Sequence, residues 1–173
     1  MTISYDYFTS PIGLIYLSAD EIGLRNVEFI ENIYDENEIF KKEKTKEILF
    51  SNSEILKNAI EQLRKYFEKS LTEFSVPVNL DGTDFQKSVW NELTLVPFGE
   101  TRSYLKQAIA LKNEKAIRAV AKANGSNPIA IIIPCHRIIG SDGSLTGYAG
   151  ELWRKKWLLE HEGFLKAEQL ELF

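Results

Sequence analysis

The sequence predicts a mixed α/β protein in two halves, and three observations support this. Residues 1–30 contain short runs rich in β-branched and aromatic residues, separated by turns that contain Gly or Pro. A strongly periodic helical pattern follows at residues 53–67, and capped helical patterns predominate from residue 83 onwards. The turn-forming pair Asp81-Gly82 lies between these stretches. We therefore expect an N-terminal α/β domain over residues 1–80 and a mainly helical C-terminal domain over residues 81–173.

Composition excludes several classes of protein. The chain has 173 residues, of which 44% are hydrophobic and 27% charged, as in an ordinary soluble protein. No apolar run approaches the roughly 18 residues that a membrane span needs, and the N-terminus does not resemble a secretory signal. The single cysteine excludes an internal disulfide and suits a reducing cytoplasm. One Cys and two His argue against structural zinc. We expect a cytoplasmic protein that needs no metal and no cofactor.

The N-terminal half reads as a small antiparallel sheet with one covering helix. Strand patterns at residues 3–8, 14–17 and 24–30 alternate with turns at 10–13 and 21–23. Residues 31–50 are acidic and then lysine-rich, and they predict a mobile connection or a ragged helix. Ser53 can cap the amphipathic helix that follows. Residues 76–80 should be extended at an edge of the sheet, because Pro77 cannot donate to a ladder.

The C-terminal half begins with a helix and continues with two shorter ones. Thr83 starts a capping-box pattern, and its helix extends through Leu93. Ser103 can cap a helix over residues 104–111, and Asn113 a second helix from 114 to about 123, with Gly125 as its stop. Two short helices joined by a tight turn match a helix-turn-helix. Any other αα-hairpin would give a similar pattern.

An apolar run interrupted by functional residue types lies near the centre of the second half. Residues 131–133, three isoleucines, predict a buried β-strand that ends at Pro134. Cys135, His136 and Arg137 follow directly. A lone cysteine is most often a small buried hydrophobe, but cationic neighbours favour the nucleophilic thiolate. These residues alone leave both interpretations open.

The distribution of charge favours a nucleic-acid partner although the net charge is −4. Within residues 102–137, seven basic residues stand against one acidic residue, a local net charge of +6. Such a run is usually a solvated face, but here it coincides with the predicted helix-turn-helix. Arg118 is the long planar cation of the second helix. It is either a surface or phosphate contact, or a side chain that fills the space left by a displaced base.

Several motifs together resemble one protein family. Residues 134–139, Pro-Cys-His-Arg-Ile-Ile, are similar to the active-site signature of the O6-alkylguanine-DNA alkyltransferases, also called methylated-DNA–protein-cysteine methyltransferases. The resemblance covers residues 82–163 and includes segments in the family's order and spacing: Pro97-Phe98-Gly99-Glu100, Ser103-Tyr104, Arg118-Ala119-Val120, Asn127-Pro128, Gly147-Tyr148-Ala149-Gly150 and the run from Trp157 to Gly163. The first 80 residues resemble the family's N-terminal domain only in size and pattern.

The resemblance implies a fold and a reaction. The N-terminal domain would have ribonuclease-H-like α/β topology, and the C-terminal domain would be helical and of winged-helix type. The alkyl group of an O6-alkylguanine in DNA would pass directly and irreversibly to Cys135, once per chain. His136 would act as the base, Glu162 would orient that histidine, and Tyr104 would contact the extruded base and serve as a proton donor.

The resemblance also implies a set of binding residues. Arg118 would fill the gap in the duplex, Tyr148 would wall the pocket, and the amide of Ala149 would donate to O6, where some members have a serine. Backbone groups at Cys135 and Ile138 would read the guanine edge, and Lys155 would lie near O6. The remaining expected contacts and supports are Ser103, Lys122, Asn127 and Arg137.

The expected partner is double-stranded DNA that carries O6-alkylguanine. A helix with small residues should enter the minor groove, so binding should be largely independent of sequence and should weaken with salt. The protein should act as a monomer. Whether O4-alkylthymine is also repaired stays open. The alternative is a non-catalytic protein that binds alkylated DNA, but such proteins replace the cysteine, and Cys135 is present.

Overall fold

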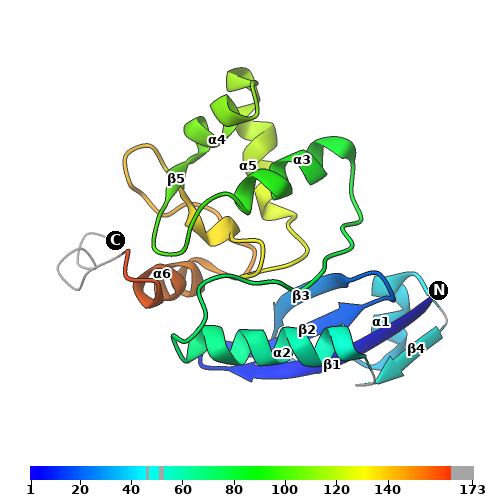
Figure 1. Cartoon of the computed structure of the whole chain (residues 1–173). Coiled ribbons are helices and arrows are strands. Elements are labelled where there is room, and N and C mark those ends of the chain that lie inside the picture. The colour runs from blue at the N-terminus through cyan, green and yellow to red at the C-terminus, as the bar shows by residue number, and fades with distance from the viewer. Residues whose placement is uncertain (46, 51–52, 165–173) are drawn as a thin grey trace. The chain divides into compact units, whose positions relative to one another are not determined.

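The computed structural model describes residues 1–45, 47–50 and 53–164 and divides the chain into two compact units, Met1–Asp81 and Gly82–Phe173. The first unit is a four-stranded sheet with two helices (Figure 1). Its strands are β1 (Thr2–Ser10), β2 (Gly13–Ala19), β3 (Leu24–Ile30) and β4 (Glu47–Phe50), in the spatial order β3-β2-β1-β4. The first three are antiparallel and β4 pairs parallel to β1. The mixed α/β class predicted from the sequence is confirmed.

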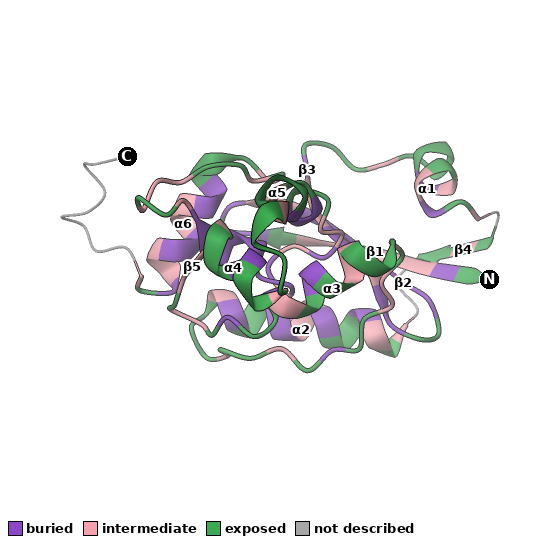
Figure 2. Cartoon of the chain, turned by 90° about the horizontal axis from the view of Figure 1, so that it is seen from above, coloured by how far each residue is buried: buried purple, intermediate pink, exposed green. Residues whose placement is uncertain are grey.

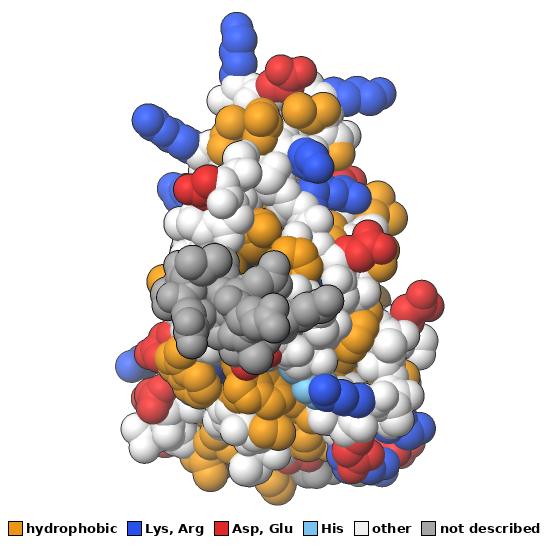
Figure 3. Space-filling view, turned by 90° about the vertical axis from the view of Figure 1, so that its left-hand side faces the viewer, with side chains coloured by type: hydrophobic (Ala, Val, Ile, Leu, Met, Phe, Trp, Pro, Cys, Tyr) orange, Lys and Arg blue, Asp and Glu red, His pale blue; other side chains and the backbone are white. Residues whose placement is uncertain are grey.

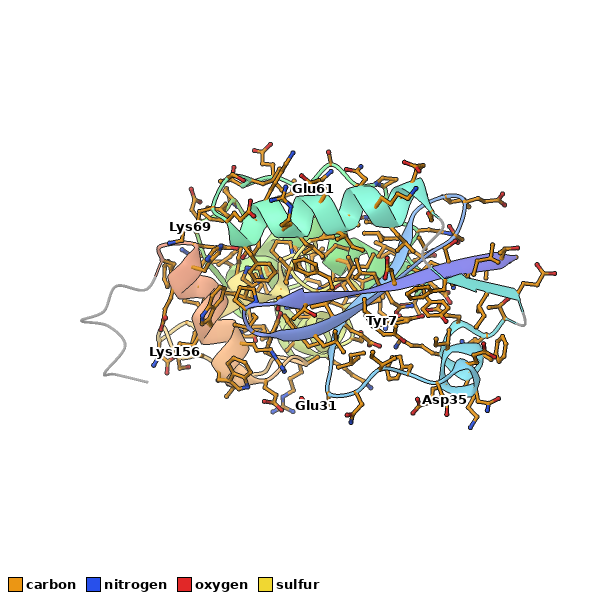
Figure 4. The ribbon with its side chains drawn as sticks, turned by 90° about the horizontal axis from the view of Figure 1, so that it is seen from below. Tyr7, Glu31, Asp35, Glu61, Lys69 and Lys156 are labelled. Atoms are coloured by element: carbon orange, nitrogen blue, oxygen red, sulfur yellow. The ribbon has the colours of Figure 1, made fainter. Side chains whose placement is uncertain are left out.

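Both faces of this sheet are covered. Alternate residues of a strand point to opposite faces, so one face buries residues such as Leu17 and Val27, and the other buries Tyr16 and Ile30. Helix α2 (Glu54–Phe67) packs on β1 and β2, and α1 (Glu36–Glu43) contributes Ile39 to the cluster around Tyr16. Figure 4 shows α2, which carries Glu61, on one side of the strands and Tyr7 on the other. The extended segment at Val78 bridges to Leu24, as expected of an edge.

Residues 31–50 are more regular than the sequence suggested. Asp35 forms a capping box with Glu38 and starts α1, and β4 follows as an edge strand. The prediction of a mobile connection or a ragged helix is confirmed in part by the helix α1, but it was wrong at β4, where a strand forms. Its short, charged pattern hid a strand whose residues are mostly exposed, so no alternation marked it. Ser53 lies at the start of α2, but its side chain makes no capping hydrogen bond.

The second unit is mainly helical. Its helices are α3 (Asp84–Leu93), α4 (Tyr104–Ala110), α5 (Ile117–Gly125) and α6 (Leu152–His161), with short 3₁₀ helices at Glu114–Ala116 and Cys135–Arg137. Two-residue strands β5 (Arg102–Ser103) and β6 (Ile138–Ile139) pair in parallel. Figure 2 shows that α4 and α5 have a buried inner face and an exposed outer face. None of the described helices is long and apolar enough to cross a membrane.

Four local predictions in this unit can be compared with the structure. The capping box at Thr83 and the cap at Ser103 are confirmed, each by a side chain that accepts a backbone N–H. Asn113 makes no side-chain cap, and α5 begins only at Ile117, after a 3₁₀ turn. Gly125 is the last helical residue and does not lie beyond the helix as a left-handed stop.

The predicted strand at residues 131–133 is a buried turn. Ile131 has φ +71°, and the amides of Ile132 and Ile133 donate to the carbonyls of Ala130 and Ile129 over 2.8 and 3.0 Å. Composition indicated burial correctly, since Ile131 and Ile133 are buried. The burial of a short apolar run does not determine whether its backbone forms a strand or a turn. The strand of this region lies after the cysteine, at β6, so Cys135 begins a 3₁₀ helix between the buried turn and that strand.

Candidate active site

The thiol of Cys135 is held in place by one asparagine. Cys135 is buried at the start of its 3₁₀ helix. The amide nitrogen of Asn127 donates to Sγ over 3.2 Å and to the carbonyl of Ile133 over 2.7 Å. The amide oxygen of Asn127 accepts from the N–H of Ile129 over 3.0 Å, which fixes the orientation of the side chain. Asn127 therefore braces the turn, as expected, and also touches the sulfur.

His136 and Glu162 form a buried pair beside this cysteine. Nε2 of His136 lies 2.7 Å from Oε1 of Glu162, and both side chains are fully buried. Because a carboxylate accepts, Nε2 carries the proton and Nδ1 keeps its lone pair. Nδ1 is buried and has no hydrogen-bond partner among the described residues. The pair expected from the sequence is therefore present, with its proton acceptor available.

Arg137 completes this cluster and is not a DNA contact. Its Nε and Nη2 donate to the two oxygens of Glu162 over 2.9 and 3.0 Å, and Nη1 donates to the carbonyl of Val96 over 2.6 Å. Only 6% of Arg137 is exposed. A guanidinium that neutralises a buried carboxylate cannot also reach a phosphate. The expectation of a DNA-binding Arg137 is contradicted, and the +6 of residues 102–137 overstates the free positive charge of that region.

Burial sets the resting protonation states of these groups. It raises the pKa of the Cys135 thiol, against the opposing effects of the Asn127 hydrogen bond and the Lys155 charge. Burial lowers the pKa of His136, and Glu162 opposes that shift. Burial alone would raise the pKa of Glu162, but His136 and Arg137 outweigh it and hold that pKa far below its usual value. At rest the site holds a neutral thiol, a neutral imidazole and a carboxylate.

A cavity opens directly onto the cysteine. It has a volume of about 380 Å³, within the range of small-molecule sites. Its lining includes two tyrosines, an arginine and the thiol, together with small residues of α5. Its lining residues are Tyr104, Ile117, Arg118, Ala121, Asn124, Gly125, Cys135, Thr146, Gly147 and Tyr148. The structure therefore brings Tyr104, Arg118, Cys135 and Tyr148 together, as the sequence predicted.

Lys155 supports one wall of this cavity from behind. Its Nζ donates to the carbonyls of Ile138, Thr146 and Gly147 over 2.5, 3.0 and 3.3 Å. Burial lowers the pKa of Lys155 to about 8, although the nearby Cys135 opposes that shift. An ammonium has three donors, and all three are directed to carbonyls. Lys155 therefore organises the loop that lines the cavity, and its expected place near O6 stays a prediction.

Tyr104 is tied to the same loop. Its hydroxyl donates to the carbonyl of Thr146 over 2.8 Å, and Nζ of Lys155 lies 5.7 Å from the centroid of its ring. Burial raises the pKa of Tyr104, while the side chain of Thr146 opposes that shift. The hydroxyl of Tyr148 is buried without a hydrogen-bond partner among the described residues, and burial raises its pKa well above the usual value.

The other expected binding residues are spread around the cavity. Arg118, Lys122 and Ala149 are exposed, and Ser103 is half-buried at the start of α4. Ile138 is buried, and its carbonyl accepts from Lys155. Figure 3 shows Lys and Arg side chains that project around the end of the molecule where α4 and α5 lie. On the face that Figure 3 draws, Lys and Arg side chains therefore predominate at this end of the second unit.

Sequence reasoning missed four lining residues. Ile117, Ala121, Asn124 and Gly125 all come from α5, at the spacing of three or four residues that places side chains on one helical face. That spacing was visible in the sequence. Only contacts could show that this face lines a cavity and that Thr146 contributes through its carbonyl.

A thiol, a histidine and a carboxylate beside a cavity are the parts of a cysteine-nucleophile site. Models of the 6-O-methylguanine DNA methyltransferase family match almost the whole chain, the ribonuclease-like domain over residues 3–80 and the DNA binding domain over residues 84–164. The chain therefore belongs to the 6-O-methylguanine DNA methyltransferase family.

Individual relatives agree with this assignment. A methylated-DNA–protein-cysteine methyltransferase from Methanosarcina acetivorans is 47% identical over 92% of this chain and 97% of the relative. One from Mycolicibacterium paratuberculosis is 42% identical over 99% of both. The crystal structure of the O6-methylguanine methyltransferase of Mycobacterium tuberculosis matches with a TM-score of 0.81 and 40% identity, covering 99% of this chain and 100% of that one. A Mycobacterium tuberculosis structure in complex with DNA matches with a TM-score of 0.80 and 41% identity, covering 98% and 99%.

Proposed function

We propose that this chain repairs DNA by moving the alkyl group of O6-alkylguanine directly and irreversibly onto Cys135. The observation that carries the proposal is the thiol at the cavity, with the buried His136–Glu162 pair next to it. Membership of the 6-O-methylguanine DNA methyltransferase family supports the same reaction. Such a protein is a methyltransferase that acts once, because a thioether has no easy route back to a thiol.

The transfer needs a thiolate, and the site can make one on demand. Nδ1 of His136 accepts the thiol proton, directly or through one water, and Glu162 stabilises the resulting imidazolium. The sulfur then attacks the alkyl carbon in line. A sulfur–carbon bond forms, the carbon–O6 bond breaks, and its electron pair stays with the guanine, which takes up a proton. Keeping the thiol neutral at rest protects it from other reactants.

The base must leave the helix to reach this sulfur. Extrusion costs a few kcal/mol, and less for a weakened alkylguanine pair. Arg118, exposed at the cavity, fills the gap in the duplex, while Tyr104 and Tyr148 flank the base. Backbone groups of Cys135, Ile138 and Ala149 read its edge. The small residues of α5 let that helix enter the minor groove closely.

The surrounding contacts give affinity without sequence preference. Lys122 and Ser103 lie where they can bind phosphates, so affinity should fall as salt rises. We propose that the second unit carries both DNA binding and the methyl acceptor, that the protein acts as a monomer, and that it works in the cytoplasm. A non-catalytic lesion binder is disfavoured because Cys135 lines the cavity.

Counting methyl groups tests this proposal. Duplex DNA with radiolabelled O6-methylguanine is supplied in excess, and protein-bound label is followed over time. We expect a rapid rise to one methyl group per active chain and then a plateau. Label that accumulates beyond one per chain, or methyl groups released to solvent, would contradict single use.

A further inference from the structure

Two buried amides bind each other between α4 and α5. Nε2 of Gln107 donates to Oδ1 of Asn124 over 3.0 Å, and Nδ2 of Asn124 donates to Oε1 of Gln107 over 2.7 Å. Gln107 is 0% exposed and Asn124 is 5% exposed. The two reciprocal bonds fix the orientation of both amides. Each side chain satisfies the other, so neither position tolerates a slip of its helix.

The apolar packing around this pair cannot by itself fix the register of the helices. The neighbouring core consists of Val89, Ala108, Val120 and Ala123, and Ala108 and Ala123 lie next to Gln107 and Asn124 in the chain. Alanines form shallow ridges that interlock weakly. A buried polar pair is known to select one register over others that pack almost equally well, at some cost in stability.

The same pair connects to the cavity from both helices. Tyr104 lies three residues before Gln107 on α4, and Ala121 lies three residues before Asn124 on α5. Asn124 itself lines the cavity, as does Arg118. A slip of α5 by one residue would move Arg118 by about 1.5 Å along the helix axis and turn it by about 100°. A displacement of that size in a reacting site costs about a hundredfold in rate.

We propose that Gln107 and Asn124 are positioning residues that hold Arg118 opposite Tyr104 across the cavity, and that reaction with duplex DNA depends on them. This inference rests on the proposed function. It separates two demands on the site. A base within a duplex needs Arg118 and Tyr104 at the right separation while it is extruded, whereas a free alkylguanine base needs only the cavity and the thiol.

The test compares two substrates in one variant. The double substitution Gln107→Leu with Asn124→Leu replaces both partners by apolar side chains, which leaves stability nearly unchanged. Rate constants are measured for duplex O6-methylguanine DNA and for the free base O6-benzylguanine, with thermal unfolding alongside. We expect the ratio of the duplex rate to the free-base rate to fall about tenfold or more, with the melting temperature close to wild type. Because Asn124 lines the cavity, the free-base rate serves as the reference for any change that the substitution makes to the cavity itself. An unchanged ratio of the two rates would overturn the proposal.

Two further variants keep the result decisive. The single substitution Gln107→Met removes both hydrogen bonds and keeps the length of the side chain. The amide of Asn124 can then bind water from the cavity in place of Gln107. This variant therefore replaces the double variant if the double variant does not fold. It should also lower the ratio of duplex to free-base rates. Gln62→Leu is the matched control, because Gln62 is a buried amide of the first unit bonded to Asn58 and Ser75. It should lower stability and leave the ratio unchanged. If wild type reacts with neither substrate, the proposed function fails instead.

Discussion

Each unit of the molecule buries a glutamate that accepts hydrogen bonds and has an arginine beside it, although of the two only Glu162 is hydrogen-bonded to its arginine. In the first unit, Oε1 of Glu43 accepts from the hydroxyl of Tyr16 and from Nδ2 of Asn26, each over 2.9 Å, and Nε of Arg25 lies 3.5 Å from Oε2. In the second unit, Glu162 binds His136 over 2.7 Å and Arg137 over 2.9 Å. Burial and charge pairing therefore do not distinguish a structural acid from a functional one.

The difference lies in whether a partner can exchange a proton near neutral pH. Burial, followed by the charge of Glu43, raises the pKa of Tyr16 far above its usual value, so that phenol stays protonated. His136 is neutral, its Nδ1 accepts no hydrogen bond from the part of the chain that the structure describes, and it directly follows the cysteine that lines the cavity. A buried acid becomes a candidate catalytic group when it supports a group that can change its charge.

The same substitution at the two glutamates should have the largest and most different effects. Glu162→Gln removes the carboxylate that stabilises the imidazolium, so the transfer rate should fall about a hundredfold or more. It also leaves Arg137 buried without its counter-ion, which should lower the free energy of unfolding by about 3–5 kcal/mol. Single-turnover kinetics and urea unfolding measure the two effects.

Glu43→Gln is the matched control. It disturbs a buried hydrogen-bond network and should lower the free energy of unfolding by about 1–3 kcal/mol. The transfer rate of the folded protein should stay at the wild-type value. A large loss of rate in Glu43→Gln, or none in Glu162→Gln, would break the distinction between the two acids.

A smaller effect is expected when one exposed arginine of each unit is replaced. Arg118→Ala should slow transfer from duplex DNA about tenfold or more, because nothing fills the space of the extruded base. Transfer from a free alkylguanine base should not change. Arg64 lies exposed on α2 and pairs with Glu61 and Glu68, so Arg64→Ala should affect neither substrate. Equal losses on both substrates in Arg118→Ala would argue for a role within the cavity instead.

The smallest expected effect is on how the free energy of unfolding changes at acidic pH. The folded-state pKa of Glu162 lies below its ordinary value of 4.5, so as pH falls below 4.5 the unfolded chain takes up a proton that the folded chain does not. The unfolded state then binds more protons than the folded state, so the free energy of unfolding decreases as the pH is lowered. The lowered pKa of His136 acts in the same direction below 6.5. Glu162→Gln should therefore show a shallower loss of stability below pH 4.5 in urea titrations. A slope as steep as that of wild type would contradict this assignment.

The sequence predicted the parts of the site that depend on local pattern. Capping residues located α3 and α4, and the motif around Cys135 located the cysteine and the histidine that we propose as nucleophile and base. The sequence could not reveal which residues form hydrogen bonds with long side chains, because those partners are distant along the chain. Arg137 belongs to the basic stretch by sequence, yet its position in a tight turn directs it to Glu162, 25 residues away.

Buried segments of irregular backbone were the second feature that the sequence could not predict. Residues 131–133 satisfy their amides within a turn, which no periodicity indicates. Lys155 lies on α6, and the carbonyls of Ile138, Thr146 and Gly147 bind its ammonium, which no sequence pattern indicates. The amide pair of Gln107 and Asn124 is likewise visible only once α4 and α5 are packed together.

The central claim is that Cys135 is the permanent acceptor of the alkyl group. Protein incubated with duplex O6-methylguanine DNA is analysed by intact-mass spectrometry and then by peptide mapping. We predict the mass of one added methyl group, located on Cys135, and no added mass in the Cys135→Ala variant, which should still bind DNA. A methyl group on another residue, or its appearance in Cys135→Ala, would contradict the account.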